Sequence, residues 1–365
     1  MARFCPYIYI GTESCDLIVL DSTTGAQLYL SKTLALGTTL SEHNFGQNQP
    51  VGDVAVDKNG IVYLADATYQ NPITFTGYHN TIEKLDGAID RIGEFGPSLT
   101  GLGIRADSDM SLAIGNRQYL FLLAWTNQNI AFTQSNRILN LYKIDLNTGA
   151  LVDSWSNLSF DVLFALTTIS EDPHTSMDMA DDFVVYYTTY GAHVFRFDTK
   201  TGIQLPPLVT VDGADPGRIY AGAIRVRPDQ SFLVSVQYDN YAPKANVTWG
   251  EIHLYDKHGN LVRTFTKTLN GTGGDPFIPL FGLALGEDDD VFWADEGAFS
   301  SLDGVFTYID KWRISTGALI MSARIRSNEG QTFEPPIFGV SSINSCRTPV
   351  GGASSSWIST ALIGA

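Results

Sequence analysis

Residues 141–149 read Leu-Tyr-Lys-Ile-Asp-Leu-Asn-Thr-Gly, a short strand of alternating apolar residues that runs into a tight turn. The same pattern occurs as Leu-Ile-Val-Leu-Asp-Ser-Thr-Thr-Gly at 17–25 and as Val-Phe-Arg-Phe-Asp-Thr-Lys-Thr-Gly at 194–202. The aspartate of such a turn can accept hydrogen bonds from backbone N–H groups, and glycine adopts a positive φ without strain. Each copy therefore predicts a strand, a turn and a second strand.

Degenerate copies of this unit at 82–87, 253–259 and 311–317 complete a series along the chain. The turn glycines of the series are Gly25, Gly87, Gly149, Gly202, Gly259 and Gly317. Their intervals of 62, 62, 53, 57 and 58 residues define a period of about 58, which is the signature of a repeat architecture.

A second pattern precedes the turn unit in several repeats. Residues 52–66 read Gly-Asp-Val-Ala-Val-Asp-Lys-Asn-Gly-Ile-Val-Tyr-Leu-Ala-Asp, and 176–187, 223–236 and 282–295 are similar. Each repeat then holds four short strands, a to d, which is the unit of a β-propeller blade. The 52–66 segment resembles an NHL repeat, and 7–30 resembles a quinoprotein or YVTN repeat. This resemblance implies a propeller fold and no particular chemistry.

The repeats predict an all-β, six-bladed propeller, with seven blades as the alternative. The second to sixth blades are expected at about 51–96, 101–156, 175–212, 220–268 and 281–325. The N-terminal repeat opens on strand b at 7–11 and has no strand a, whereas 337–345 form a strand with no later partner. We therefore expect residues 337–345 to become strand a of the first blade and close the ring. This closure would bring Cys5 and Cys346 close together, either as a disulfide or as two thiols.

Composition narrows the function classes. The 365 residues carry a net charge of −16, which disfavours nucleic acid and anionic membranes as partners. No apolar stretch predicts membrane insertion, and no secretory signal is visible, so synthesis in the cytoplasm is expected. We divide the chain into a propeller domain, 1–346, and an apolar tail, 347–365, that docks on a partner chain or on the propeller.

Long connections are expected on one face only, because the a–b and c–d turns are short. The b–c connections are placed at 68–80, 126–137, 239–250 and 295–304. Aromatic residues among amides and hydroxyls in such loops suit protein or carbohydrate contact. The binding candidates are Tyr69, Phe75, Tyr78, Phe132, Tyr238, Tyr241, Trp249 and Phe299. The alternative is that each aromatic packs its own loop.

No pattern in the sequence predicts a catalytic site or a cofactor. The six histidines lack metal-ligand spacing, and the acidic run 287–290 fits a solvated turn better than a Ca²⁺ site. A weaker alternative is a metal-dependent lactonase with Asp66, Asp295 and Glu296 around a central ion. Asp178 and Arg225 occupy equivalent strand-a positions in neighbouring blades and are expected to form a structural ion pair.

The tail carries its apolar residues near the end, at Trp357, Ile358, Leu362 and Ile363, which are the candidate docking residues. A chain without a signal sequence but with a surface rich in Tyr, Thr, Asn and Gly fits a virion protein of a bacteriophage. We therefore hypothesise a structural or host-contacting propeller of a phage tail or capsid appendage. The alternatives are a cytoplasmic scaffold or ligand-binding propeller, and the lactonase.

Overall fold

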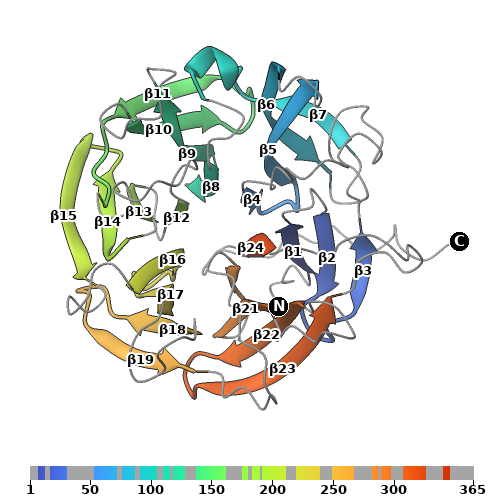
Figure 1. The fold of residues 1–365 in the computed structure, drawn as a ribbon, viewed down its shortest axis with the longest axis vertical. Coiled ribbons are helices and arrows are strands. Elements are labelled where there is room, and N and C mark those ends of the chain that lie inside the picture. The colour runs from blue at the N-terminus through green and yellow to red at the C-terminus, as the bar shows by residue number, and fades with distance from the viewer. Residues whose placement is uncertain are drawn as a thin grey trace, which may run out of the picture.

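The computed structural model describes 7–12, 17–30, 53–71, 76–86, 91–104, 110–115, 118–127, 137–161, 175–179, 183–189, 191–210, 219–238, 249–266, 282–286, 289–296, 307–325 and 340–345. These residues form six antiparallel four-stranded sheets arranged as a ring around a central axis (Figure 1). The expected six-bladed β-propeller is therefore confirmed, and seven blades are excluded.

The six blades follow one another along the chain, and within each the strands run from the axis to the rim. Blade 1 holds β24 (Val340–Ser345), β1 (Tyr7–Thr12), β2 (Leu17–Asp21) and β3 (Gln27–Leu30), and blade 2 holds β4 (Asp53–Val56), β5 (Val62–Asn71), β6 (Thr76–Leu85) and β7 (Arg91–Phe95). Blade 3 holds β8 (Met110–Gly115), β9 (Tyr119–Asn127), β10 (Arg137–Asp145) and β11 (Leu151–Ser156), and blade 4 holds β12 (Ser176–Met179), β13 (Val184–Thr188), β14 (His193–Asp198) and β15 (Ile203–Thr210). Blade 5 holds β16 (Ile219–Val226), β17 (Phe232–Tyr238), β18 (Trp249–Tyr255) and β19 (Leu261–Phe265), and blade 6 holds β20 (Leu283–Leu285), β21 (Asp290–Glu296), β22 (Thr307–Arg313) and β23 (Ala318–Ile325).

The ring closes through the first blade, as the sequence predicts. Strand β24 pairs antiparallel with β1, with Ile8 opposite Ser345 and Ile10 opposite Ile343. Strands from the two ends of the chain thereby share one sheet, beside the axis in Figure 1. Cys5 and Cys346 lie outside the described residues, so their proximity stays a prediction.

Two boundaries differ from the sequence interpretation. The third blade begins at Met110 rather than near 101, because Thr100–Leu102 form a 3₁₀ turn (η2) that ends in Gly103 at φ 79°. In the second blade, much of the expected loop 68–80 is strand, since β5 and β6 stay paired out to Asn71 opposite Thr76. Backbone pairing between two β-prone segments thus continues beyond the point where the hydrophobic pattern weakens.

The core consists of six apolar clusters, one between each pair of neighbouring blades. Trp125, for example, packs with Met177 and Tyr187 between blades 3 and 4. Trp293 packs with Ala223 and Phe265 between blades 5 and 6. Because each sheet is covered on both faces, most of the stability of the ring depends on contacts between blades rather than within them.

As expected, the aspartates of the repeated turns accept hydrogen bonds within their own turn. In the turn at 145–149, Asp145 Oδ1 accepts hydrogen bonds from the N–H of Asn147 at 3.0 Å and of Thr148 at 2.8 Å, and from the Thr148 hydroxyl at 3.0 Å. The hydrogen bond from the Thr148 backbone has the largest effect on the pKa of Asp145. Together, the three hydrogen bonds hold this pKa below its ordinary value. Gly149 follows at φ 72°.

The turn glycines also meet the preceding blade, which the sequence pattern does not reveal. A Cβ on Gly259 of blade 5 would lie 2.5 Å from the carbonyl oxygen of Leu208 in β15 of blade 4. A Cβ on Gly25 of blade 1 would lie 2.7 Å from the Cβ of Ala323 in β23 of blade 6. The c–d turn of one blade therefore rests on the outermost strand of the blade before it, and glycine permits that approach.

Candidate binding face

The ring has two faces, defined by which connections meet there. The turn face carries the a–b and c–d turns, and the loop face carries the b–c and d–a connections. The assignment follows from contacts within blade 6, where Asp289 of the a–b turn accepts a hydrogen bond from the N–H of Ser315 in the c–d turn at 2.9 Å. Most of the residues outside the described set belong to the loop-face connections.

Four of the eight aromatic candidates lie on strands that lead into the loop face. The register places Tyr69 of β5 opposite Tyr78 of β6 in blade 2. It also places Tyr238 of β17 opposite Trp249 of β18 in blade 5. The backbone therefore brings two pairs of aromatic residues, nine and eleven residues apart in the sequence, to the loop-face ends of two hairpins. Phe75, Phe132, Tyr241 and Phe299 lie outside the described residues.

A carboxylate–imidazole pair at the loop face was missed by the sequence analysis. Asp161, which follows blade 3, contacts His193 Nδ1 at the start of β14 and also accepts the His193 backbone N–H at 3.0 Å. Asp161 is buried, whereas the His193 side chain is 32% exposed. The contact joins blades 3 and 4, and because it engages Nδ1, it constrains the orientation of the imidazole ring. The two residues are 32 apart in sequence, so no local pattern could have found them.

Gly191 makes room for this pair. A Cβ on Gly191 would lie 2.2 Å from the Asp161 side chain. The Asp161 segment is held further by Tyr187, whose hydroxyl donates to the Ser159 carbonyl at 2.8 Å. The loop-face end of the interface between blades 3 and 4 is therefore built from fixed polar groups.

A second buried polar group runs along β18. His253 Nε2 lies 2.9 Å from a Glu251 carboxylate oxygen, and His253 Nδ1 lies 3.0 Å from the Tyr255 hydroxyl. The three residues alternate along one strand, so period-two spacing could have identified them as sharing a sheet face. The Tyr255 ring stacks on Phe232 with centroids 5.3 Å apart, which anchors the group in the core.

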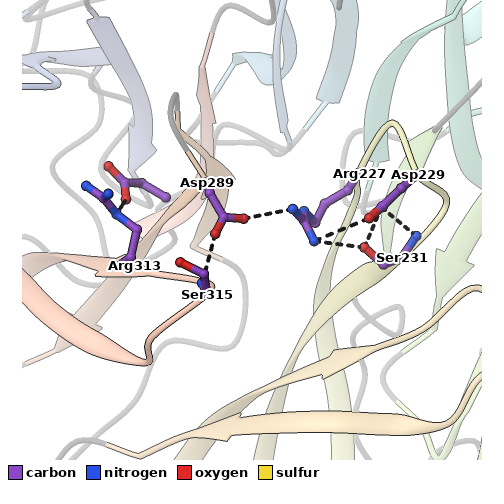
Figure 2. A network of polar contacts seen from close by, with 7 residues as sticks. Arg227, Asp229, Ser231, Asp289, Arg313 and Ser315 are labelled. Atoms are coloured by element: carbon purple, nitrogen blue, oxygen red, sulfur yellow. Dashed lines mark hydrogen bonds and ion pairs between the residues drawn. The ribbon is translucent and has the colours of Figure 1, made fainter.

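The turn face carries ionic contacts between blades 5 and 6 (Figure 2). Arg227, in the a–b turn of blade 5, donates to Asp289 Oδ1 at 2.7 Å, and Figure 2 shows the bridge continuing from Asp289 to Ser315. Its other partners are Ser231 and Asp229, at 3.2 and 3.5 Å. We call Arg227, Asp289 and Ser315 the turn-face clasp. It joins two blades through side chains that are about one-quarter exposed at Arg227 and Asp289.

The end of the acidic run 287–290 is therefore part of the structure of a turn. Asp289 adopts φ 69° and is engaged in the clasp, whereas Asp290 is buried at the start of β21. Asp290 receives Arg313 Nε at 2.5 Å and lies 3.1 Å from Lys311 Nζ. These cationic partners neutralise Asp289 and Asp290, and the burial of Asp290 differs from the solvated turn that the sequence predicts.

Strand a of blades 2 and 4 carries buried polar residues that bond to the next blade. Asp178 of β12 accepts the Val226 N–H of β16 at 2.6 Å, beside the buried Arg225. The ion pair between Asp178 and Arg225 stays a prediction. Asp53 of β4 has the same role in blade 2, accepting the Ser111 hydroxyl at 2.7 Å and the Leu112 N–H at 2.8 Å from β8.

The lactonase alternative needs clustered ligands around the axis. Asp66 lies within β5 opposite Thr81, and Asp295 and Glu296 lie near the end of β21, opposite Tyr308 and Thr307. Blade 1 separates the two strands in the ring. In the part of the chain that the structure describes, no group of three His, Cys, Asp or Glu side chains could hold a metal ion.

No helix among the described residues is long and apolar enough to span a membrane.

Comparisons with known proteins support the fold. No family model matches the sequence, and no curated protein is similar to it in sequence. Among solved structures, the chain is similar to a protein of unknown function from Bacteroides caccae, with a TM-score of 0.57 and 10% identity over 94% of this chain and 100% of that one. It is also similar to TolB from Acinetobacter baumannii, with a TM-score of 0.52 and 10% identity over 93% of this chain and 65% of that one. The chain thus spans less than two thirds of TolB, and likeness at this identity shows the propeller fold alone.

Proposed function

We propose that this protein is a non-enzymatic propeller that binds partner proteins of a larger assembly through its loop face. The main support is the pairing of Tyr69 with Tyr78 and of Tyr238 with Trp249 at the loop-face ends of two hairpins. Rigid aromatic residues supply contact area at a low entropic cost and are enriched at protein interfaces. The ring below them is joined by buried contacts between blades, which gives these hairpins a rigid base.

We further propose that the assembly is a bacteriophage particle, in which the protein is a tail or capsid-appendage component that contacts other virion proteins or a host surface. This proposal rests on the sequence profile, which combines an acidic chain, few lysines and many polar loop residues with no cofactor motif. Carbohydrate is the second kind of ligand that an aromatic and amide surface suits.

The proposal can be tested by site-specific photo-crosslinking. A crosslinking amino acid is placed at Tyr69 or Tyr238 in the full chain and irradiated in the cells or particles that contain the protein. The matched control is Phe183, an aromatic residue that is 43% exposed and precedes β13 on the turn face. Cross-links to defined proteins at the two loop-face positions, and none at Phe183, are expected.

Each possible outcome has a different meaning. Cross-linked peptides from virion structural proteins support the phage assignment, and peptides from cellular proteins alone contradict it. Equal labelling at Phe183 contradicts the assignment to the loop face. Hydrolysis of a lactone that depends on added metal, and that Asp66→Asn abolishes, would contradict the non-enzymatic proposal.

A further inference from the structure

Among the described residues, the outermost strand of each sheet pairs with one strand only, and these edges differ in how they are protected. Strand β15 carries Pro206 and Pro207, β11 carries Asp153, and β7 carries Gly93 at φ 147°. Proline, charge and irregular backbone are the usual means by which proteins prevent pairing at an edge. Strands β3 and β19 are short, with four and five residues.

Strand β23 of blade 6 is less protected: Arg324 is its one charged residue, and its register shift against β22 is a feature that all six outermost strands share. It spans eight residues, Ala-Leu-Ile-Met-Ser-Ala-Arg-Ile, with no proline, glycine or acidic residue. Among the described residues, it pairs only with β22. Leu319 and Ile320 are 44% and 47% exposed. A long apolar edge of this kind is a template for a further strand.

The chain itself supplies a segment that fits this edge. Residues 356–363 read Ser-Trp-Ile-Ser-Thr-Ala-Leu-Ile, which are uncharged and rich in residues that favour β structure. The edge of β23 is also nearly neutral, with Arg324 as its one charged residue. Neither partner would bury an unpaired carboxylate when the two strands join.

The place where the described chain ends makes this pairing accessible within one molecule. Strand β24 ends at Ser345 opposite Ile8, beside Tyr7, which pairs with Asp21 of the c–d turn. The chain therefore leaves β24 at the turn face, where β23 begins directly after Gly317. Blade 6 is the neighbour of blade 1, since Gly25 of blade 1 contacts Met321 and Ala323.

The length of the connection is sufficient. Residues 346–355 can span about 33 Å when extended, whereas a fifth strand of blade 6 would lie about 19 Å from β20, which contacts β24. A short tether also raises the effective concentration of the segment to about the millimolar range, which favours its own chain over a second copy.

We propose that residues 356–363 of the same chain add to the free edge of β23 as a fifth strand of blade 6. Main-chain hydrogen bonds would supply the pairing, and the exposed side chains of Leu319 and Ile320 would supply the apolar contact. The site covers the longest outermost strand, among those described, that has no proline, glycine or acidic residue. This proposal does not depend on the function of the loop face.

Hydrogen exchange of the full chain tests the proposal directly, in comparison with a chain that ends after Ser355. Amides of β23 that do not bond to β22 are expected to exchange about tenfold or more slowly in the full chain. Adding a synthetic peptide of residues 356–363 to the shortened chain should restore this protection. Strand β11 is the matched control, because Leu151 and Val152 are also exposed but the edge carries Asp153, and its exchange should not change.

A second variant tests the pairing at the β23 edge without unfolding the propeller. Ile320→Lys places a charge at an exposed position, so the propeller should stay folded while the protection by residues 356–363 is lost. Equal exchange in the two chain lengths would overturn the proposal, as would protection that appears on β11 instead. Light scattering identifies the occupant: monomers of both lengths support pairing within one chain, and a dimer of the full chain alone would overturn it in favour of a second copy.

Discussion

Two turns of this propeller have the same internal hydrogen bonds but different surroundings. In the a–b turn of blade 2, Asp57 Oδ1 accepts the N–H of Asn59 at 2.8 Å and of Ile61 at 2.9 Å. In the c–d turn of blade 5, Asp256 Oδ1 accepts the N–H of His258 at 2.8 Å and of Asn260 at 2.9 Å. Their glycines, Gly60 and Gly259, have φ 81° and 85°.

The difference lies outside the turns. A Cβ on Gly60 would meet no atom within 4 Å, whereas one on Gly259 would lie 2.5 Å from the Leu208 carbonyl oxygen of the preceding blade. Gly60 is therefore needed for backbone conformation alone, and Gly259 is needed for conformation and for the contact between blades. The same turn motif thus shapes a hairpin in blade 2 and also packs against a neighbouring sheet in blade 5.

Gly259→Ala and Gly60→Ala measure this difference and should give the largest effect. Alanine in the left-handed region costs about 1–2 kcal/mol at either position. At Gly259, displacement of the Leu208 backbone should add about 1–3 kcal/mol. Urea unfolding of the two variants gives the comparison, and equal losses of unfolding free energy would show that the blade contact at Gly259 relaxes without cost.

Asp53→Ala tests a contact between blades near the axis of the ring. The variant leaves the Ser111 hydroxyl and the Leu112 N–H without their present acceptor in a buried site. A loss of about 1–3 kcal/mol in unfolding free energy is expected. Asp57→Ala is the control in the same blade, because its carboxylate accepts hydrogen bonds from Asn59 and Ile61 of its own turn. A smaller loss for Asp53→Ala than for this control would contradict the importance of contacts between blades.

The turn-face clasp should contribute less. A double-mutant cycle of Arg227→Met and Asp289→Asn should give a coupling of about 0.5–1 kcal/mol, because both side chains are partly exposed to water. Raising the salt concentration should reduce the coupling. The cycle is measured by urea unfolding at low and high salt, and a coupling that does not respond to salt would argue against an ionic origin.

The turn aspartates predict a weak dependence of stability on pH. The Asn260 side chain, followed by backbone N–H groups, holds the pKa of Asp256 below its ordinary value of 3.8. A lowered folded-state pKa contributes stability above the ordinary value, and this stability is lost as the pH falls through the folded-state pKa. As the pH is lowered below about 4, the urea concentration at the unfolding midpoint should therefore decrease. Asp256→Asn should make this decrease smaller. An unchanged pH profile in the variant would exclude Asp256 as a contributor.

The local parts of the fold could be read from the sequence because their signals are local. Asp145 and Gly149 lie within one turn, and the same pair of residue types recurs with a regular period. The missing strand a at the N-terminus predicted the pairing of β24 with β1, which is confirmed. The start of the third blade was misplaced because the segment before Met110 contains a 3₁₀ turn rather than a strand.

The candidate site could be predicted only in part. The sequence placed Tyr69 and Tyr238 near the loop face, but their pairing with Tyr78 and Trp249 depends on the strand register. The Asp161–His193 contact carries no sequence signal, since it joins segments of two different blades.

By itself, the sequence determined the hairpin turns, because alternation and turn chemistry act between near neighbours. The regular period favoured six blades over seven, and the missing strand a at the N-terminus indicated the strand that closes the ring. Only the tertiary structure decided that a Cβ on Gly259 would meet the Leu208 carbonyl oxygen while one on Gly60 would meet no atom within 4 Å. It also decided that Asp289 bonds to Arg227, 62 residues away. These contacts form only when sheets from separate repeats are packed side by side, so their partners are set by the geometry of the ring.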